Sequence, residues 1–270
     1  MLSKGLFNPT LEHFAIVANG NFLVREILLE IIKDKKVIAL DGASNKLATL
    51  KIKPSVILGD FDSIKPESLW GVETLISINN PNQQPIKNDK GITVVHTVDQ
   101  DLTDLVKAIR YCKSSGAASI HILCATGGRL DHHEGAMRCL RSEYVKDCMI
   151  YLHSEQQTLR FSKDESITIR GEKDDKCGVL AFPAATCTSK GLRYNMVDMK
   201  LELGFSESIC NSLYEQNATV EIKGEALLIM PPFFQSQRDF SHKSDVERLE
   251  LQLRDAKGEI AEEKVLNHTV

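Results

Sequence analysis

Two aspartates follow directly after a short apolar run of the chain. Residues 55–58 lead into Gly59, and Asp60 and Asp62 come next, with Phe61 between them. If the chain stays extended through Phe61, both carboxylates project to the same side. Two like charges so close together are unfavourable unless a cation lies between them or one of them is protonated. The spacing therefore favours a metal site, although Asp and Ser are also common in ordinary turns.

A second acidic group precedes a segment with helical spacing. Asp99, Asp101 and Asp104 fall within six residues, and Asp101 is a candidate N-cap for the helix that follows. Three carboxylates are more than capping requires. A hard cation such as Mg²⁺ takes one or two carboxylates and completes its coordination with water and phosphate oxygens. The two acidic groups together could therefore hold Mg²⁺.

A glycine-rich turn supplies groups that suit an anion. Gly127 and Gly128 allow backbone N–H groups to approach a phosphate at a helix N-terminus, and Arg129 offers a planar pair of donors. Asp131 is expected to orient Arg129 or to help cap the helix. His132 is expected to be a hydrogen-bonded support, with general base as the less favoured alternative. Neither the Walker-type nor the dinucleotide-type phosphate loop is present. These residues predict metal-assisted chemistry on a polyphosphate.

The elements that must position these residues alternate between strands and helices. Apolar runs predict strands at 13–18, 37–40, 55–58, 93–98, 120–124 and 149–152, and helical spacing predicts helices at 22–33, 102–115 and 131–142. This alternation predicts an α/β Rossmann-like domain over residues 1–153, with a mostly parallel sheet and helices on both faces. Ligands of such sheets bind beyond the carboxyl ends of the strands, which is where the acidic groups fall.

The second half of the chain has a different pattern. Short strand-like runs occur at 158–161, 166–169, 178–182, 192–196, 199–203, 219–222 and 226–230, with a predicted hairpin connection at 223–225. These runs predict an all-β antiparallel sandwich domain over residues 154–232. Residues 79–91 are expected to form a polar surface loop.

The last segment, residues 233–270, is charged and is expected to be a helical tail. Val246, Leu249, Leu253, Ala256 and Ile260 repeat every three or four residues. The repeat is too short to predict a coiled coil, so we expect an amphipathic helix that lies on the body through this apolar stripe.

Composition excludes several classes of protein. The chain has 270 residues, of which 42% are hydrophobic, and its formal net charge is −4. These values exclude a disordered tail protein and a general nucleic-acid binder. No segment approaches the ~18 apolar residues of a membrane-spanning helix, and residues 1–14 contain no apolar signal core. The seven cysteines form no C-x-x-C pair and suit reduced thiols. We therefore expect a cytoplasmic protein that binds neither membrane nor nucleic acid.

Four motifs, in order along the chain, resemble the motif set of thiamine pyrophosphokinases. They are DGASNKL at 41–47, GDFDS at 59–63, DQDLTD at 99–104 and GGRLDH at 127–132. In the second half, GLRYN at 191–195 and SICN at 208–211 resemble the thiamine-contacting aromatic and the Ser-Asn turn of that family. The resemblance covers about residues 14–230.

The resemblance implies transfer of pyrophosphate from ATP to the hydroxyl of thiamine, giving thiamine diphosphate and AMP with Mg²⁺ as cofactor. It also implies a homodimer whose thiamine site lies between the α/β domain of one subunit and the β-domain of the other. The implied catalytic residues are Asp60, Asp62, Asp104, Arg129 and Asp131, and the implied metal ligands are Asp41, Asp60, Asp62 and Asp104. ATP and its phosphates would be bound by Asp41, Asn45, Ser63, Thr103, Gly127, Gly128 and Arg129, and thiamine by Gln100, Tyr194, Cys210 and Asn211.

Two alternatives remain at this point. Tyr194 stands where the family usually has Trp, and Cys210 where it has Ser, which leaves open a pyrophosphokinase for another heterocyclic alcohol such as a pterin. A non-catalytic thiamine- or nucleotide-binding protein is the second alternative, although the intact acidic positions argue against it. Tyr194 is expected to stack on a thiamine ring. Its alternative role is packing inside the β-domain.

Overall fold

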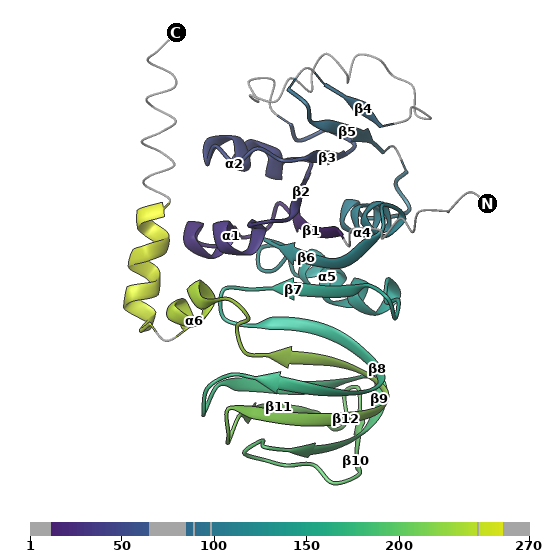
Figure 1. The fold of residues 1–270 in the computed structure, drawn as a ribbon, viewed down its shortest axis with the longest axis vertical. Coiled ribbons are helices and arrows are strands. Elements are labelled where there is room, and N and C mark those ends of the chain that lie inside the picture. The colour runs from purple at the N-terminus through teal and green to yellow at the C-terminus, as the bar shows by residue number, and fades with distance from the viewer. Residues whose placement is uncertain (1–11, 65–84, 89, 98, 242, 256–270) are drawn as a thin grey trace, which may run out of the picture.

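The computed structural model describes residues 12–64, 85–88, 90–97, 99–241 and 243–255. The chain has an α/β part at one end and a β-rich part at the other (Figure 1). Of the predicted loop at 79–91, residues 79–84 and 89 lie outside the described residues, as do Ala256 and Ile260. The loop prediction is wrong at Ile86–Lys87, which form a short strand because they pair with the strand at Thr93–His96. Within the described part of the chain, no helix is long and apolar enough to span a membrane.

The α/β part is built on parallel strands. Its elements are β1 (Glu12–Val17), α1 (Arg25–Ile32), β2 (Lys36–Leu40), α2 (Ala43–Thr49), β3 (Val56–Gly59), β4 (Ile86–Lys87), β5 (Thr93–His96), α4 (Asp104–Ser114), β6 (Ala117–Leu123), α5 (Leu130–Ser142) and β7 (Met149–His153). The strands β7, β6, β1, β2, β3 and β5 are neighbours in this order and all pair in parallel, while the short β4 pairs antiparallel at the edge. The predicted strand–helix alternation is confirmed.

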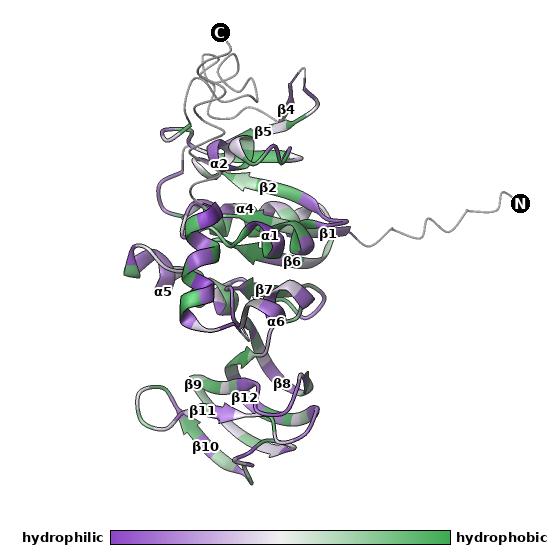
Figure 2. Cartoon of the chain, turned by 90° about the vertical axis from the view of Figure 1, so that its left-hand side faces the viewer, coloured by the Kyte–Doolittle hydropathy of each residue, from purple (hydrophilic) through white to green (hydrophobic). Residues whose placement is uncertain are grey.

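Both faces of this sheet are covered, which explains its almost continuous apolar strands. In β1, Ala15 and Val17 face the cluster that includes the buried residues of α1 and α2. Phe14 and Ile16 face the opposite cluster, which includes the buried residues of α4 and α5. The strands β2 and β6 are largely hydrophobic in Figure 2. Two packed layers therefore hold the carboxyl ends of the strands in place.

The β-rich part continues the same sheet. It comprises β8 (Thr158–Arg170), β9 (Lys176–Lys190), β10 (Met199–Glu202), β11 (Ser208–Ser212) and β12 (Asn217–Met230), all paired antiparallel around a third apolar core. The pairing of β7 with β8 joins the two parts into one mixed 12-stranded sheet. The hydrogen bonding is unbroken from one part to the other, so a separate antiparallel sandwich is not confirmed.

Three details of the predicted β-rich part are wrong. Residues 223–225 are not a hairpin connection, because β12 runs straight through them with a shift of register. Gly224 has φ +102°, and a Cβ there would lie 2.6 Å from the carbonyl oxygen of Ala184, so the glycine serves a bulge. The runs at 158–161 and 166–169 are one strand. The run at 192–196 forms only an isolated bridge, between Leu192 and Leu213.

The described part of the chain ends in two helices beside α1 (Figure 1). These are α6 (Gln235–Ser241) and the helix of residues 245–255, called the tail helix below. The predicted docking face of the tail helix is wrong: Val246, Leu249 and Leu253 are 67%, 56% and 50% exposed. It is instead Leu251 that packs against the core around α1.

Candidate active site

Three carboxylates converge at the carboxyl ends of two neighbouring strands. Asp41 follows β2, and Asp60 and Asp62 follow β3, so the parallel pairing of these strands brings them together. One oxygen from each lies within 4.8 Å of the others. A Cβ on Gly59 would lie 3.0 Å from the Cβ of Asp41, so a glycine is needed at this approach. The predicted acidic site is present at the predicted edge of the sheet.

Asp41 has a shifted pKa and a buried carboxylate oxygen. Its Oδ1 is buried and accepts no hydrogen bond from any described residue. Burial raises the pKa of Asp41, and the charge of Asp62 raises it further, although hydrogen bonds from Ser63 and Gly42 lower it. A buried carboxylate oxygen without a donor is costly unless a cation satisfies it. The oxygen-only ligand set suits a hard divalent cation such as Mg²⁺.

The loop that carries Asp60 and Asp62 is not extended, contrary to the sequence prediction. Phe61 has φ +67° and is buried, with its ring stacked on His96 at a centroid distance of 5.3 Å. The stacking fixes the turn, and the turn still directs both carboxylates toward Asp41. The sequence identified the right residues through the wrong backbone conformation.

Short polar contacts tie the acidic loop to its neighbours. Gln100 Nε2 donates to Asp60 Oδ2 at 3.4 Å, so this predicted thiamine ligand lies directly beside the cluster. Ser63 Oγ donates to Asp62 Oδ1 at 2.8 Å. Asn45 Nδ2, on α2, donates to the carbonyl oxygen of Ser63 at 2.9 Å. Asn45 therefore supports the loop from the side.

Asp104 lies next to the three-carboxylate cluster but forms its own ion pair. Its Oδ1 is 3.1 Å from Lys107 Nζ, which is itself 3.4 Å from Thr97 Oγ1. Its Oδ2 would be 3.3 Å from a Cβ on Gly59. Of the four predicted metal ligands, the structure thus groups three and places Asp104 beside them.

The predicted helix cap at Asp101 is wrong. Thr103 is the N-cap of α4, and its Oγ1 accepts from the Val106 N–H at 3.4 Å. The Asp101 N–H instead donates to Asp99 Oδ1 at 2.8 Å, in the turn before the helix. A hydroxyl one residue before the first helical turn is the better placed acceptor.

The glycine turn at 127–128 has the left-handed backbone that its composition predicts. Gly127 and Gly128 have φ +75° and +68°. A Cβ on Gly127 would lie 2.3 Å from Asn21 Nδ2, so no other residue fits there without movement. The Gly127 N–H already donates to His133 Nδ1 at 3.1 Å. The supporting histidine is thus His133, whereas His132 is exposed.

Arg129 and Asp131 form the pair that the sequence suggested. Arg129 Nε lies 3.1 Å from Asp131 Oδ1, and its Nη2 lies 2.6 Å from Oδ2. The hydrogen bonds from Arg129 hold the pKa of Asp131 below its ordinary value. Both side chains are well exposed at the start of α5. Asp131 therefore orients a guanidinium group that is open to an anionic ligand.

The turn between β1 and α1 links the acidic cluster to the glycine turn. A Cβ on Gly42 would lie 2.5 Å from Asn19 Nδ2, on the side of the acidic cluster. Two residues further on, the Asn21 N–H donates to the Thr126 carbonyl at 3.3 Å, and its side chain faces Gly127. Sequence reasoning missed both asparagines, because neutral amides in a turn match no catalytic motif.

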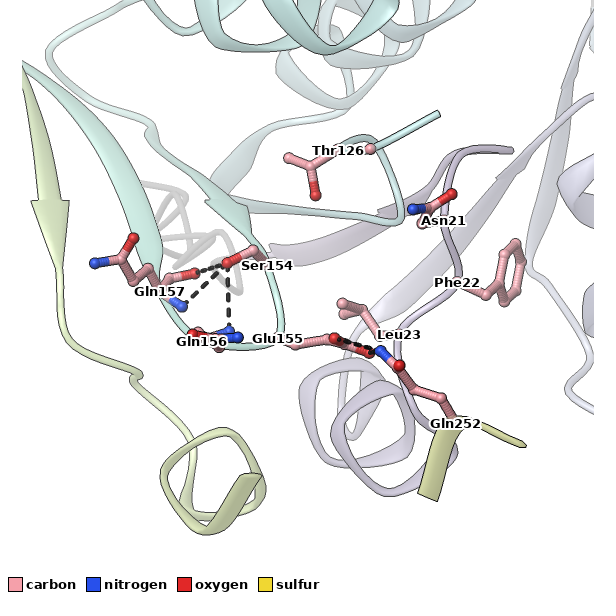
Figure 3. A pocket seen from close by; sticks show the side chains of 10 residues that line it. Asn21, Phe22, Leu23, Thr126, Ser154, Glu155, Gln156, Gln157 and Gln252 are labelled. Atoms are coloured by element: carbon pink, nitrogen blue, oxygen red, sulfur yellow. Dashed lines mark hydrogen bonds between the residues drawn. The ribbon is translucent and has the colours of Figure 1, made fainter. Parts of the chain in front are cut away.

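A polar cavity of about 290 Å³ lies next to the turn between β1 and α1, with Asn21 in its lining (Figure 3). Its lining comes from four segments that are distant in sequence: Asn21, Phe22, Leu23; Thr126, Gly127; Ser154, Glu155, Gln156, Gln157; and Gln252 of the tail helix. Ser154 Oγ accepts from the N–H groups of Gln156 and Gln157 at 3.4 and 3.1 Å and holds this short loop in place. Burial raises the pKa of Glu155.

The predicted thiamine-binding residues of the second half lie together, with Tyr194 and Cys210 exposed and Asn211 buried beneath Tyr194. Asn211 is buried, and its amide accepts from the Tyr194 N–H at 3.1 Å and donates to the Tyr194 carbonyl at 2.8 Å. Cys210, with φ +59°, is exposed next to it. Tyr194 is 65% exposed, so packing inside the β-rich part is excluded as its role.

Within one chain this group does not meet the acidic cluster. The strand β11, which carries Cys210 and Asn211, lies at the opposite end of the molecule from β3 (Figure 1). Asp60 and Asp62 follow directly after β3. A site that uses both groups would need two chains.

The fold and the site define an α/β protein with a cluster of three carboxylates, able to hold a divalent cation, at the carboxyl ends of its strands, and with a β-rich second part. The family model "Thiamin pyrophosphokinase, catalytic domain" matches residues 29–152, and "Thiamin pyrophosphokinase, vitamin B1 binding domain" matches residues 157–228. Together they cover well over half of the chain. The chain belongs to the thiamine pyrophosphokinase family.

Individual relatives agree with this assignment. The chain is 28% identical to thiamine pyrophosphokinase 3 of Oryza sativa over 195 residues, 66% of each chain, and 29% identical to thiamin pyrophosphokinase 1 of Caenorhabditis elegans, over 73% of this chain and 78% of the relative. It thus spans about two thirds of the length of the rice relative. The thiamine pyrophosphokinase of Bacillus subtilis has the same fold, with a TM-score of 0.68 at 23% identity over 83% of this chain and 100% of that one. The structure of the yeast thiamin pyrophosphokinase has a TM-score of 0.67 at 17% identity, over 86% of this chain and 90% of that one.

Proposed function

We propose that this chain is a thiamine pyrophosphokinase, which transfers pyrophosphate from ATP to the hydroxyl of thiamine and releases AMP. The observation that carries the proposal is the cluster of Asp41, Asp60 and Asp62, with its buried oxygen that lacks a donor, in a chain of this family. The enzyme names of the relatives support the same reaction. The two alternatives from the sequence, a pterin-like substrate and a non-catalytic binding protein, are not favoured.

Asp41, Asp60 and Asp62 would hold Mg²⁺. The ion would neutralise charge on the polyphosphate and fix its geometry. The substrate oxygen attacks the β-phosphorus, the bond from that phosphorus to the α,β-bridging oxygen breaks, and AMP leaves with that oxygen. Asp104 accepts the hydroxyl proton in this proposal, because its carboxylate lies beside the cluster, where it forms an ion pair with Lys107 at 3.1 Å. Arg129, oriented by Asp131, contacts the phosphates.

In this proposal ATP binds along the turn between β1 and α1. The polar cavity on one side of Asn21 receives the base, and the phosphates extend past the glycine turn to the acidic cluster beside Asn19. Ser63 contacts the phosphate end in this arrangement. Asn45 and Thr103 use their side chains within the protein, so we propose that they position the loop and α4 rather than bind ATP directly.

Thiamine would bind between two subunits of a homodimer, with Gln100 beside the acidic cluster of one and Tyr194, Cys210 and Asn211 of the other. The β-rich part supports this with further large apolar side chains that are exposed in the single chain: Val197, Leu203, Phe205, Ile209 and Tyr214. Burial of such side chains against a second subunit would stabilise the proposed dimer. In this proposal residues 1–153 form the catalytic domain, which is Rossmann-like, and residues 154–232 form the β-sandwich domain for thiamine binding and dimerisation.

The test identifies the nucleotide that is released when the protein turns over ATP. Purified protein with Mg²⁺ and ATP is incubated with thiamine, with a hydroxymethylpterin or with neither, and nucleotides are separated by chromatography. We expect AMP only with thiamine, and none after chelation of the metal. Formation of AMP with the pterin alone would show that the pterin, and not thiamine, is the substrate. Formation of ADP would mean attack at the γ-phosphorus. If ATP were turned over with neither alcohol, the chain would be a binding protein.

A further inference from the structure

The tail helix contributes to the polar cavity although it lies beyond the residues that the family models match. The second model ends at residue 228, whereas Gln252 lines the cavity beside Glu155 (Figure 3). This wall is therefore a feature of the present chain rather than of the two matched domains. Its contacts indicate what it does there.

Two polar contacts dock the tail helix at the rim of the cavity. Gln252 Nε2 donates to the Glu155 carboxylate at 3.0 and 3.3 Å. One turn further on, Asp255 Oδ2 accepts from the Arg25 N–H at 3.0 Å. Arg25 is the first residue of α1, whose N-cap, Val24, has no side-chain acceptor, so Asp255 supplies the missing cap from a distant part of the chain.

The tail helix does not dock through its apolar stripe. Val246, Leu249 and Leu253 are at least half exposed, and Leu251 alone of its leucines packs against the core. Its specific contacts are thus concentrated on Glu155, which lines the cavity, and on Arg25, two residues after the lining residue Leu23. The tail helix is therefore held at the cavity itself.

The lining of the cavity identifies the chemistry of that ligand. Its residues include Asn21, Gln156, Gln157 and Gln252, which carry amides, and Glu155, which carries a carboxylate, and no lysine or arginine occurs among the described lining residues. Such a lining does not suit phosphate. Side-chain amides and carboxylates pair with the edges of bases, and a carboxylate accepts from an exocyclic amine but repels a carbonyl oxygen. Adenine has an amine at the position where guanine has a carbonyl.

We infer that Glu155 selects adenine over guanine by accepting from its exocyclic amine, and that Gln252 of the tail helix is the positioning residue that holds Glu155 and closes the cavity. The inference rests on the proposed function, because it takes a nucleoside triphosphate as the ligand. Burial raises the pKa of Glu155 and the hydrogen bond from Gln252 lowers it, so Gln252 also favours the ionised, accepting form.

The test compares two substitutions on the tail helix in the full chain. Gln252→Ala removes the amide that holds Glu155, and Glu250→Gln, at an exposed position of the same helix, is the matched control. We expect Gln252→Ala to raise the KM for ATP by about three- to tenfold, the range for one net hydrogen bond, and to reduce the preference for ATP over GTP. The thiamine KM and kcat should stay unchanged, and the control should match the wild type in every constant.

Two outcomes separate this inference from the proposed function. An active wild-type enzyme whose Gln252→Ala variant keeps its ATP KM and its ATP-to-GTP ratio would overturn the inference alone. A wild type that binds Mg²⁺–ATP in calorimetry but forms no AMP would overturn the proposed function, and the same comparison of variants would then be made on Kd. Hydrogen exchange adds a direct measurement. ATP should slow amide exchange in residues 245–255, and unchanged exchange would overturn the inference that the tail helix closes the cavity.

Discussion

Asp41→Asn should stabilise the protein without metal while removing its response to Mg²⁺. The substitution keeps the shape of the side chain and removes one of three charges whose oxygens lie within 4.8 Å. Two unit charges 4.8 Å apart repel by about 1 kcal/mol in water and about 3 kcal/mol at an effective dielectric constant of 20. Because Asp62 is exposed and Asp60 only half-buried, the lower part of this range applies.

We therefore expect the free energy of unfolding in EDTA to rise by about 1 to 2 kcal/mol, which corresponds to a Tm increase of a few degrees. Wild type should gain stability as Mg²⁺ is added, by about 2.7 kcal/mol at one hundred times its Kd, whereas the variant should gain little. Thermal unfolding in EDTA and across a Mg²⁺ series measures both effects.

The matched control is Asp34→Asn. Asp34 also has a left-handed backbone, with φ +59° against +38° for Asp41, and it lies in the turn after α1, away from the cluster. Asn tolerates this conformation as well as Asp does, so backbone strain is equal in the two variants. A metal-free Asp41→Asn protein that is less stable than wild type, or one that keeps the full Mg²⁺ response, would refute the argument.

Three further predictions concern the rest of the site and the core. Tyr194→Ala should raise the thiamine KM by about two- to thirtyfold with the ATP KM unchanged, since stacking and cation–π contacts are worth about 0.5–2 kcal/mol; a lower Tm with an unchanged KM would remove Tyr194 from the site. Gly127→Ala should weaken ATP binding, measured by calorimetry, because its methyl group would displace Asn21; unchanged affinity would contradict the role of this turn. Burial lowers the pKa of His121 to about 3 and that of His153 well below 6.5. Below pH 6.5 the unfolded chain therefore binds more protons than the folded chain, and the free energy of unfolding decreases as the pH falls, by about 1.4 kcal/mol per histidine per pH unit. Denaturant unfolding at pH 7.5 and 5.5 checks this, and equal stabilities would count against it.

The sequence predicts the acidic site because strand ends and carboxylates leave local signals. The runs before Asp41 and Asp60 are apolar, and parallel pairing of the two strands then brings the carboxylates together. The left-handed turn at Phe61 could not be predicted, because it depends on stacking with His96, a residue that is distant in sequence. The residue types were therefore predictable and the backbone path was not.

Bulges and long curved strands were harder to predict. Gly224 breaks the apolar alternation in the way that a hairpin turn does, and only the close approach of Ala184 distinguishes the bulge. The cavity was missed for a related reason. Asn21, Glu155 and Gln252 are polar residues of three separate segments, without a motif, and only the folded chain brings them together.

The continuous pairing of β7 with β8 has a mechanical consequence. Tyr151, Leu152 and His153 pair directly with Arg160, Leu159 and Thr158, so the link between the two parts is a hydrogen-bonded ladder rather than a hinge. The span between the acidic cluster and Tyr194 is therefore fixed within one chain. In the proposed homodimer, assembly of the shared site then depends on association alone, so we expect specific activity to fall when the protein is diluted below the dissociation constant of that dimer.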